Sequence, residues 1–493
     1  ALSSVIPYYA AEKMQKLQVL EIESCHGMKE VFETQRINNS VIMLQLGNLK
    51  ILNIKGCDLL EHIFTFSTLE SLVQLEELKI KSCKAVKVIV VKEEEDDGDQ
   101  TTKASSKSRH VSFPYLKTIK LVDLPELVGF SLGMNEFQWP SLDKILINDC
   151  PRMRVFTAGG STAPQLKYVK TRLGKHSPRC WFNSHVTTTT TQQHQESTSF
   201  SHPAVTSEEI HWSFHNLIEL HVTDKTYVEK IIVPSNEMLH LKKLEKIYVR
   251  ECASVEEIFE TVERTKTNSG SDESQTTVVT LPNLTQVELV NLDCLRHIWK
   301  SNRCLVFEFP NLTTVHINRC VRLEHVFSSA IVVSLLQLQK LQITNCENME
   351  KVFVEEEEDG EESDGKTNEI VLPHLKSLVL YKLPGLRYIW KSNRWTLFEF
   401  PNLTTVSIVS CKSLQHVFTS SMVGSLKQLK ELSISNCHHM EEVVVKDANI
   451  VVEEEEESDG KMSELMLPCL KSLKLYGLSC LKGFFVGKED FSF

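Results

Sequence analysis

The chain lacks any run of about 18 consecutive apolar residues, and its N-terminus does not place a basic segment before an apolar one. The first absence argues against a membrane-spanning helix, and the second argues against a secretory signal peptide. The sequence also begins with Ala1 instead of methionine, so we expect it to be part of a longer protein. We therefore predict a chain without a membrane span.

Motifs of catalysis and metal binding are also missing. The chain has no G-x-S-x-G, no H-E-x-x-H, no glycine-rich loop before a helix and no C-x-x-C pair. Without the C-x-x-C spacing, the cysteines offer no basis for a structural zinc site. We therefore expect no enzyme, and neither a metal nor another cofactor.

An excess of positive charge is lacking as well. The formal net charge is −11 and the sequence pI is about 5.9. Such a balance does not favour sequence-independent binding to nucleic-acid phosphates. We expect the partners to be proteins.

What the sequence does contain is repetition. Residues 281–370 return as residues 372–466, and FPNLTTVHINRCVRLEHVF at Phe309 becomes FPNLTTVSIVSCKSLQHVF at Phe400, 91 residues later. A fixed internal period is typical of stacked repeat architectures. The duplicated block is therefore the natural starting point for predicting the fold.

A shorter unit lies inside that period. Leu312, Val315, Ile317 and Cys320 follow the pattern L-x-x-L-x-I-x-x-C, with starts typically 24 to 28 residues apart. We count fifteen such units, which begin at Leu17, Leu49, Leu75, Leu116, Leu142, Leu166, Leu217, Leu244, Leu284, Leu312, Leu338, Leu375, Leu403, Leu429 and Leu470. This leucine-rich-repeat signature predicts an α/β repeat solenoid, a horseshoe with a parallel concave sheet and an irregular or short helical convex side.

Nine of the 14 cysteines occupy the ninth place of a repeat. They are Cys25, Cys57, Cys83, Cys150, Cys252, Cys320, Cys346, Cys411 and Cys437. Stacked repeats would place them about 4.8 Å apart, near enough for disulfides in an oxidising environment. We interpret them as small buried thiols that fill the turn after each strand, which favours a reducing, cytoplasmic location.

The chain divides by composition into three regions. Residues 1–171 form the first half of the repeat array and residues 213–493 the second half. Between them, residues 172–212 are rich in Thr, Ser, Gln and His, which predicts a polar linker or disordered insertion. We interpret the histidines of this region as solvated imidazoles: His176, His185, His194 and His202.

Acidic insertions interrupt the second half. Residues 360–367 match the phosphate-binding pattern G-x-x-x-x-G-K-T, which requires a local positive field and a following helix. Here carboxylates from Glu355 to Asp364 crowd the segment, and Pro373 follows soon afterwards. We interpret it as a solvated loop and expect no nucleotide binding.

The residues at places three, five, seven and eight of each repeat should project from the concave sheet, where solenoids usually bind partners. One predicted group is a basic ladder of Lys55, Lys79, Lys81, Lys120, Lys144, Lys170, Arg172, Lys246 and Arg250. The other is a polar, nearly neutral group of His316, Asn318, Arg319, Gln342 and Asn345. We predict that both groups contact protein partners.

Four features of the sequence together resemble a known family. They are these repeats, the recurring F-P-N-L, the I-W-K-S-N-R segments at Trp299 and Trp390, and the EEEED-type insertions. Over nearly the whole chain outside the Thr-rich insertion, they resemble the C-terminal repeats of plant coiled-coil nucleotide-binding leucine-rich-repeat disease-resistance proteins, in particular long lettuce-type candidates. The resemblance implies recognition of a pathogen effector, or of a host protein that the effector modifies. It also implies that the first repeats pack on a nucleotide-binding domain of the same receptor and autoinhibit it. That domain has no counterpart in this sequence, so nucleotide binding does not carry over.

The basic ladder suggests which surface would make this autoinhibitory contact. We predict that the region of Lys79, Lys81 and Lys120 contacts an acidic surface of the nucleotide-binding domain, while later repeats contact the effector. Two alternatives remain. A substrate-binding arm of a ubiquitin ligase would need an F-box domain upstream. An extracellular receptor would use Asn311 and Asn402 as glycosylation sites, but its usual L-x-G-x-I-P repeat is absent.

Overall fold

The computed structural model spans the whole chain and describes most of the repeat array. The described residues are 4–6, 14–33, 36–37, 40–41, 46–91, 110–133, 135–153, 155–178, 214, 217–223, 229–261, 277–300, 305–354, 368–390, 396–446, 465–486 and 491–492. The G-x-x-x-x-G-K-T segment, the acidic insertions and residues 179–212 of the predicted linker lie outside them. The chain divides into two compact units, Ala1–Leu217 and Ile218–Phe493, and we describe each unit separately.

Unit 1 is built on one parallel sheet, which we call its main sheet. Its parallel strands, in sequence order, are β2 (Val19–Glu23), β6 (Ile51–Lys55), β8 (Glu77–Lys81), β11 (Thr118–Val122), β14 (Lys144–Asn148) and β16 (Val169–Thr171). Strand β17 (Gly174–His176) then pairs antiparallel with β16. Neighbours in the parallel part are consecutive repeats, as a solenoid requires.

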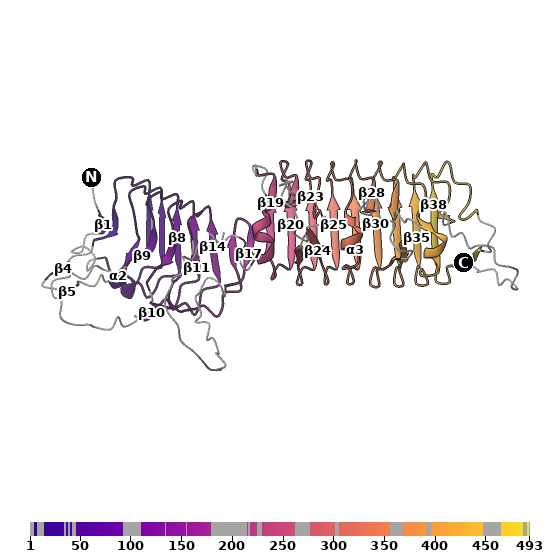
Figure 1. Ribbon diagram of the computed structural model, residues 1–493. Coiled ribbons are helices and arrows are strands. Elements are labelled where there is room, and N and C mark those ends of the chain that lie inside the picture. The colour runs from indigo at the N-terminus through magenta and orange to yellow at the C-terminus, as the bar shows by residue number, and fades with distance from the viewer. Residues whose placement is uncertain are drawn as a thin grey trace, which may run out of the picture. The chain divides into compact units, whose positions relative to one another are not determined.

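Unit 2 has a longer main sheet of the same kind. Its strands are β18 (Leu217–Thr223), β20 (Lys246–Arg250), β23 (Gln286–Val290), β25 (Thr314–Asn318), β27 (Lys340–Thr344), β30 (Ser377–Tyr381), β33 (Thr405–Val409), β35 (Glu431–Ser435) and β38 (Ser472–Tyr476). Figure 1 shows these strands side by side as successive rungs. A main-sheet strand follows every repeat start predicted from the sequence, which confirms the leucine-rich-repeat solenoid.

Short strands and helices form the return side of each unit. In unit 1 these are β1 (Ser4–Ile6) with β3 (Glu30–Phe32), β7 (Phe64–Thr65) with β9 (Val88–Val91) and β12 (Gly129–Ser131), β10 (His110–Ser112) with β13 (Glu136–Gln138) and β15 (Ser161–Thr162), the hairpin β4 (Arg36–Ile37) and β5 (Ser40–Val41), and α2 (Phe66–Ser71).

In unit 2 they are β19 (Ile231–Val233) with β21 (Glu257–Phe259), β22 (Thr277–Thr280) with β24 (Leu305–Glu308), β26 (Phe327–Ser328) with β28 (Lys351–Val354) and β31 (Tyr388–Trp390), β29 (Asn368–Val371) with β32 (Thr396–Glu399), β34 (Phe418–Thr419) with β36 (Val444–Val445), β37 (Leu465–Met466) with β39 (Phe491–Ser492), η2 (Ser235–His240), α3 (Ser329–Val332) and α4 (Ser420–Val423).

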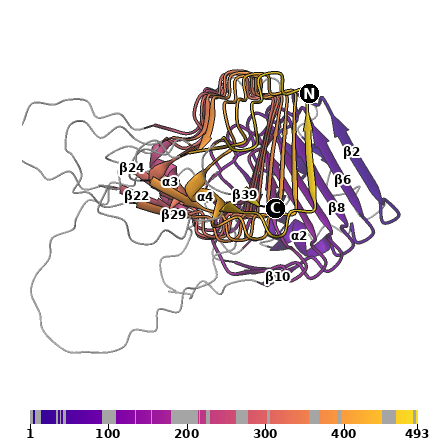
Figure 2. The same ribbon diagram turned by 90° about the vertical axis from the view of Figure 1, so that its right-hand side faces the viewer.

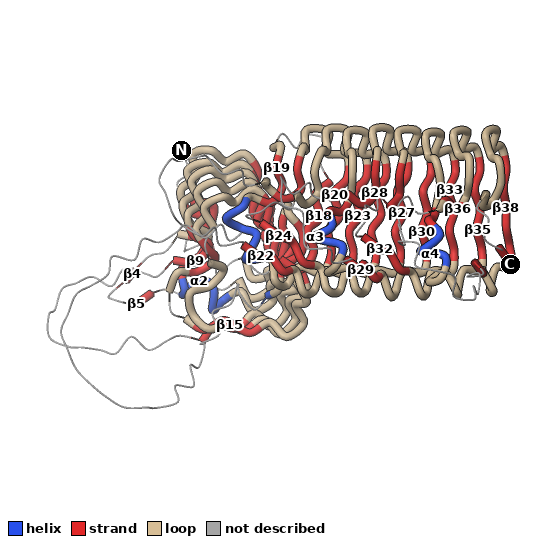
Figure 3. Tube along the Cα trace, turned by 45° about the vertical axis from the view of Figure 1, so that its right-hand side comes forward, coloured by secondary structure: helices blue, strands red, loops and turns tan. Residues whose placement is uncertain are grey.

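The view along unit 2 separates its two sides. Figure 2 shows α3, α4 and the short strands β22, β24 and β29 on the side away from the main sheet. Figure 3 shows loops joining the two sides at each turn of the coil. None of the helices among the described residues is both long enough and apolar enough to cross a membrane.

The core lies between these two sides. In the repeat that starts at Leu312, the side chains of Leu312, Val315, Ile317 and Cys320 are fully buried. Alternation along a strand sends positions four and six inward and positions three, five and seven outward. Each repeat thus covers the apolar edge of the previous repeat, which is the source of its stability.

In both copies of the duplicated block, a buried tryptophan contacts the next repeat through a hydrogen bond and ring packing. The Nε1 atom of Trp299 donates to the Val326 carbonyl at 2.7 Å, and that of Trp390 donates to the Val417 carbonyl at 2.9 Å. Each indole also packs on the phenylalanine of the following F-P-N-L, with ring centroids 4.7 and 4.5 Å apart. The duplication therefore preserves a buried contact as well as a sequence pattern.

The eighth place of the repeat differs from the prediction. The sequence placed it on the sheet face together with places three, five and seven, but Arg319 and Asn345 lie one residue past the ends of β25 and β27. Their φ values are 57° and 55°, in the left-handed region, and Ser82, Asp123 and Lys382 share this conformation. Position eight is therefore a turn, which explains why Asn, Asp, Ser and Gly recur there.

The start of the predicted linker is ordered. Residues 172–178 belong to the described part of unit 1 and include β17. His176, which we expected to be solvated, is fully buried, and its Nε2 atom lies 2.9 Å from the Thr171 hydroxyl. That expectation was wrong because the hairpin of β16 and β17 folds this imidazole against the last parallel strand.

Candidate functional site on the outward faces of the main sheets

Positions three, five and seven of each repeat form three outward columns on each main sheet. In β8, Leu78 and Ile80 are buried, Glu77 and Lys79 are half-buried and Lys81 is exposed. Parallel strands in register place equivalent positions side by side, about 4.8 Å apart. The columns are therefore continuous surfaces built from residues distant in sequence.

The structure places the predicted partner-binding residues as follows. The main-sheet strands of unit 1 carry six lysines of the basic ladder, Lys55, Lys79, Lys81, Lys120, Lys144 and Lys170, and Arg172 follows β16. Strand β20 of unit 2 carries the remaining two cations, Lys246 and Arg250. Of the polar group, His316 and Asn318 lie on β25, Gln342 lies on β27, and Arg319 and Asn345 lie in the turns after these two strands. Register joins Lys55 to Lys81, Lys79 to Lys120 and His316 to Gln342. The basic ladder is thus divided between the two units.

Two carboxylates, the half-buried Glu77 and the exposed Glu23, pair with part of the ladder in unit 1. Glu77 lies 2.9 Å from Lys79 Nζ and 3.2 Å from Lys120 Nζ. Burial raises the pKa of Glu77, but the hydrogen bonds from Lys79 and Lys120 outweigh this effect and hold the pKa below its usual value. At the first strands, Lys55 pairs with Glu23, and the hydrogen bond from Lys55 lowers the pKa of Glu23.

Three lysines of the ladder remain available. Lys81, Lys144 and Lys170 are exposed, and no carboxylate among the described residues lies within ion-pair distance of them. Arg172, by contrast, lies 3.6 Å from Asp149. These three lysines therefore carry positive charge without a carboxylate partner in the described part of the chain, and Lys79 and Lys120 share the single carboxylate of Glu77.

The face of unit 2 is close to neutral. Lys246 lies 3.6 Å from Glu219, and Arg250 pairs with Glu288, so both predicted cations of β20 have partners. From β25 to β35, the only charged residues in the outward columns are Lys340 and Glu431. This part of the face therefore presents mainly amides, hydroxyls and rings.

Some side chains of the predicted polar group of unit 2 already interact with one another. Asn345 Nδ2 donates to Asn318 Oδ1 at 3.1 Å, across two repeats. Burial lowers the pKa of His316, although nearby Glu288 opposes this effect, so His316 is neutral at pH 7. Gln342 pairs in register with His316 and with Val379.

Two exposed tyrosines were missed in the sequence-based prediction. Tyr381 on β30 is 37% exposed and Tyr476 on β38 is 65% exposed, both in the position-seven column. Lys382 Nζ lies 5.2 Å from the centre of the Tyr381 ring. The signal was present in the repeat pattern, since exposed aromatic residues at a sheet face often mark binding surfaces.

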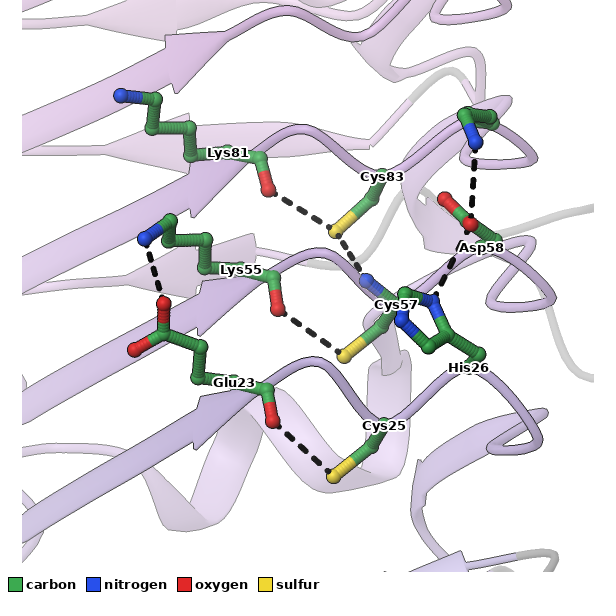
Figure 4. A network of polar contacts seen from close by, with 9 residues as sticks. Glu23, Cys25, His26, Lys55, Cys57, Asp58, Lys81 and Cys83 are labelled. Carbon is green, nitrogen blue, oxygen red and sulfur yellow. Dashed lines mark hydrogen bonds and ion pairs between the residues drawn. The ribbon is translucent and has the colours of Figure 1, made fainter.

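The ninth-place thiols form a structural column beside the outward face. All nine Sγ atoms donate to the carbonyl two residues earlier, at 3.2–3.8 Å. Figure 4 shows three of them, where the Cys57 N–H also donates to Cys83 Sγ at 3.4 Å. Burial raises the pKa of Cys83 to about 11 and that of Cys150 to about 12. The thiols of Cys83 and Cys150 are therefore protonated and poor nucleophiles at neutral pH.

The described cysteines are all free thiols. In the part of the chain that the structure describes, no three His, Cys, Asp or Glu side chains gather closely enough to hold a metal ion. What the outward faces offer is a rigid array of side chains suited to binding a surface.

Two solved structures resemble the chain at low identity. One is "Crystal structure of TLR13-ssRNA13 complex", with 10% identity, 87% of this chain and 70% of that chain covered, and a TM-score of 0.17. Another is "Plant peptide hormone receptor RGFR1 in complex with RGF2", with 10% identity, 95% and 92% covered, and a TM-score of 0.13. At these scores neither likeness bears on the fold or the site. No curated protein matches the chain.

A family model does match. The model described as "Plant disease resistance protein RPS2-like, leucine-rich repeats" covers residues 43–167, 191–347 and 335–438, well over half of the chain. The match includes most of the duplicated block, up to residue 438, and eight of the nine ninth-place cysteines. The chain therefore belongs to the RPS2-like leucine-rich-repeat family of plant disease resistance proteins.

Proposed function

We propose that this chain is the protein-recognition region of an intracellular plant immune receptor, located in the cytoplasm. Its partner is a pathogen effector, or a host protein that an effector has modified. The observation that carries this proposal is the match to disease-resistance repeats over a chain whose outward columns continue across successive parallel strands. A rigid, solvent-facing array of this kind binds protein surfaces without performing chemistry.

The two faces support a division of labour. Unit 1 presents uncompensated positive charge at Lys81, Lys144 and Lys170, which complements an acidic surface. We propose that this surface belongs to the nucleotide-binding domain of the same receptor and that the contact holds the receptor inactive. Unit 2, with its nearly neutral face, then contacts the effector or the modified host protein.

The alternatives receive no support from these observations. The family match is to disease-resistance repeats and not to a ubiquitin ligase. An extracellular receptor would carry glycans on Asn311 and Asn402, whose amides donate instead to the backbone carbonyls of Pro282 and Pro373, both at 2.7 Å.

The charge contact can be tested in a receptor that carries this chain behind its nucleotide-binding domain. Lys81→Glu, Lys144→Glu and Lys170→Glu together should raise resting cell-death signalling in leaves without any effector, because reversal repels an acidic surface. These lysines have no ion pair among the described residues, so their reversal breaks no ion pair there. Unchanged resting signalling at equal protein level would contradict the autoinhibitory contact.

A matched control distinguishes the effect of reversing a charge from the effect of removing it. Lys144→Gln removes the same positive charge without adding a negative one, and it should have a weaker effect than Lys144→Glu. Lys79→Glu is a poor probe, because it would place a new carboxylate beside Glu77, 2.9 Å from the present lysine nitrogen. An increase in signalling from Lys79→Glu alone would indicate local repulsion and not a lost domain contact.

A further inference from the structure

A tract of short side chains crosses the face of unit 2 near its end. We call Ser407 and Val409 on β33 together with Ser433 and Ser435 on β35 the serine tract. All four side chains are half-buried, and register makes them a block two strands wide, with Ser407 beside Ser433 and Val409 beside Ser435.

Tyrosines stand at both ends of this tract. In the position-seven column, Tyr381 pairs in register with Val409, and Tyr476 pairs with Ser435. Three strand spacings separate the two tyrosines, which is about 14 Å between their Cα atoms. The tract is therefore wide enough for one polypeptide segment, whose thickness is about 10 Å.

The hydroxyls of the tract are free to bind a ligand. Ser407, Ser433 and Ser435 have no side-chain hydrogen bond to any other described residue, in contrast to Thr313 and Thr404, whose hydroxyls donate to backbone carbonyls of the preceding repeat. A hydroxyl both donates and accepts. Burial under a partner would therefore require the partner to supply new hydrogen bonds.

The duplicated block provides an internal comparison. At the positions equivalent to Ser407, Val409, Ser433 and Ser435, the first copy carries His316, Asn318, Gln342 and Thr344. His316, Gln342 and Thr344 are larger than the serines that they match. Two side chains of the first copy already make hydrogen bonds, since Asn318 accepts from Asn345 and Thr344 donates to the Ile317 carbonyl. The open, unpaired tract is thus particular to the second copy.

Building on the proposed function, we propose that the serine tract is the contact site for an extended, uncharged segment of the protein partner that carries an aromatic or aliphatic side chain. An extended backbone leaves N–H and C=O groups unpaired, which the three serine hydroxyls can satisfy. The apolar side chain of the segment packs against Tyr381 or Tyr476 at the ends of the tract.

A helical partner fits these hydroxyls less well. A helix pairs its backbone groups internally, so the serine hydroxyls would lose water without gaining partners. A charged segment is also disfavoured, because the tract itself holds no charge and burial of an unpaired charge is costly. The nearest charged residues in the outward columns are Glu431 and Lys474, which pairs in register with Ser433, and Lys382 lies in the turn after β30 beside Tyr381.

The test uses the full chain and a random nonapeptide library displayed on phage, followed by fluorescence anisotropy with the selected peptides. The key variant combines Ser407→His, Val409→Asn, Ser433→Gln and Ser435→Thr. It installs the residues that the first copy carries at equivalent positions, so the fold should tolerate it. We expect uncharged peptides to be selected and their Kd to rise about tenfold or more in this variant.

Two single substitutions refine the test. Tyr476→Ala should also weaken peptide binding, whereas Tyr248→Ala should not, because Tyr248 lies on β20 far along the sheet and its hydroxyl donates to Gln286 Oε1 at 3.1 Å. Equal affinity for the fourfold variant and the original chain would overturn the proposal. Selection of mainly charged peptides, or of none, would overturn it too.

The outcomes also distinguish this inference from the proposed function. Peptides that bind but respond only to Lys81→Glu or Lys144→Glu would leave a recognition surface on the chain and reject the serine tract as its location. An effector response that persists in a receptor carrying the fourfold variant would do the same.

Discussion

The outward faces of unit 1 and unit 2 have the same backbone geometry but carry different side chains. Unit 1 presents lysines, of which Lys79 and Lys120 pair with Glu77 while Lys81 has no carboxylate partner among the described residues. Unit 2 presents amides, hydroxyls and tyrosines, with few charges between β25 and β35. A repeat therefore constrains its inward positions and the turn at position eight, and leaves the outward columns free to vary.

The physical reason lies in the alternation along each strand. Ile80 in unit 1 and Ile408 in unit 2 occupy the same sixth place and are both fully buried. The neighbouring outward residues contact mainly solvent and their equivalents in adjacent repeats. They can therefore change from Lys79 to Ser407 without disturbing the core.

The largest effect should come from breaking the part that the two faces share. Ile80→Ala and Ile408→Ala should each lower the free energy of unfolding of their own unit by about 2–5 kcal/mol, because each leaves a cavity in a close-packed core. Denaturant unfolding followed by hydrogen exchange would assign each loss to its unit. A cost below about 1 kcal/mol at one site would show that the two cores are not equivalent.

A smaller effect should separate the units by pH. Burial lowers the pKa of both His297 and His325, whose rings lie 6.1 Å apart in unit 2. Because the unfolded chain then binds protons more readily, the stability that these groups contribute is present above pH about 6.5 and is lost as pH falls through their lower folded pKa values.

The corresponding group of unit 1 is Glu77, whose lowered pKa contributes stability that is lost only as pH falls below the usual glutamate range. Between pH 7 and pH 5, hydrogen exchange should therefore show that the free energy of unfolding of unit 2 falls, because His297 and His325 are protonated more readily in the unfolded chain. The double variant His297→Gln with His325→Gln should lose most of this pH dependence and keep only the part that His316 contributes, since burial lowers the pKa of His316 too. Retention of the same acid-side slope in that variant would contradict the assignment.

The smallest effect should come from the charge pairs themselves. A double-mutant cycle with Glu77→Gln and Lys120→Met should give a coupling of about 0.2–1 kcal/mol that shrinks as salt is added. The neighbouring pair of unit 2, Ser407→Ala with Ser433→Ala, should show no coupling and no salt dependence. A coupling that did not respond to salt would mean that packing, and not charge, joins Glu77 to Lys120.

Much of the fold could be predicted because its rule is local. The spacing from Leu312 to Cys320 sets which side chains are buried, and that spacing recurs in each unit, so the solenoid and eight of the nine buried thiols followed from the sequence. The prediction was wrong for Cys25, which is exposed on the first strand's side of the array. The same alternation correctly identified places three, five and seven as outward, as Lys81 shows. Their role in binding a partner stays a prediction.

The eighth place was harder to predict, since its left-handed turn depends on how the chain leaves the strand. Arg319 adopts φ 57° although arginine gives no local reason for it. The turn persists because the Arg319 N–H donates to the Thr344 carbonyl of the next repeat at 2.9 Å. A hydrogen bond between neighbouring coils thus overrides the local preference.

The sequence by itself determined the repeat, its inward leucines and cysteines, and the family to which the chain belongs. Only the tertiary structure decided which polar side chains pair with one another. Glu23 pairs with Lys55, 32 residues away, and His176 is buried against Thr171, whereas Ser433 has no side-chain partner among the described residues. Burial follows from a periodicity that each repeat carries alone. Pairing depends on which residues the stacking register brings together, and no single repeat contains that information.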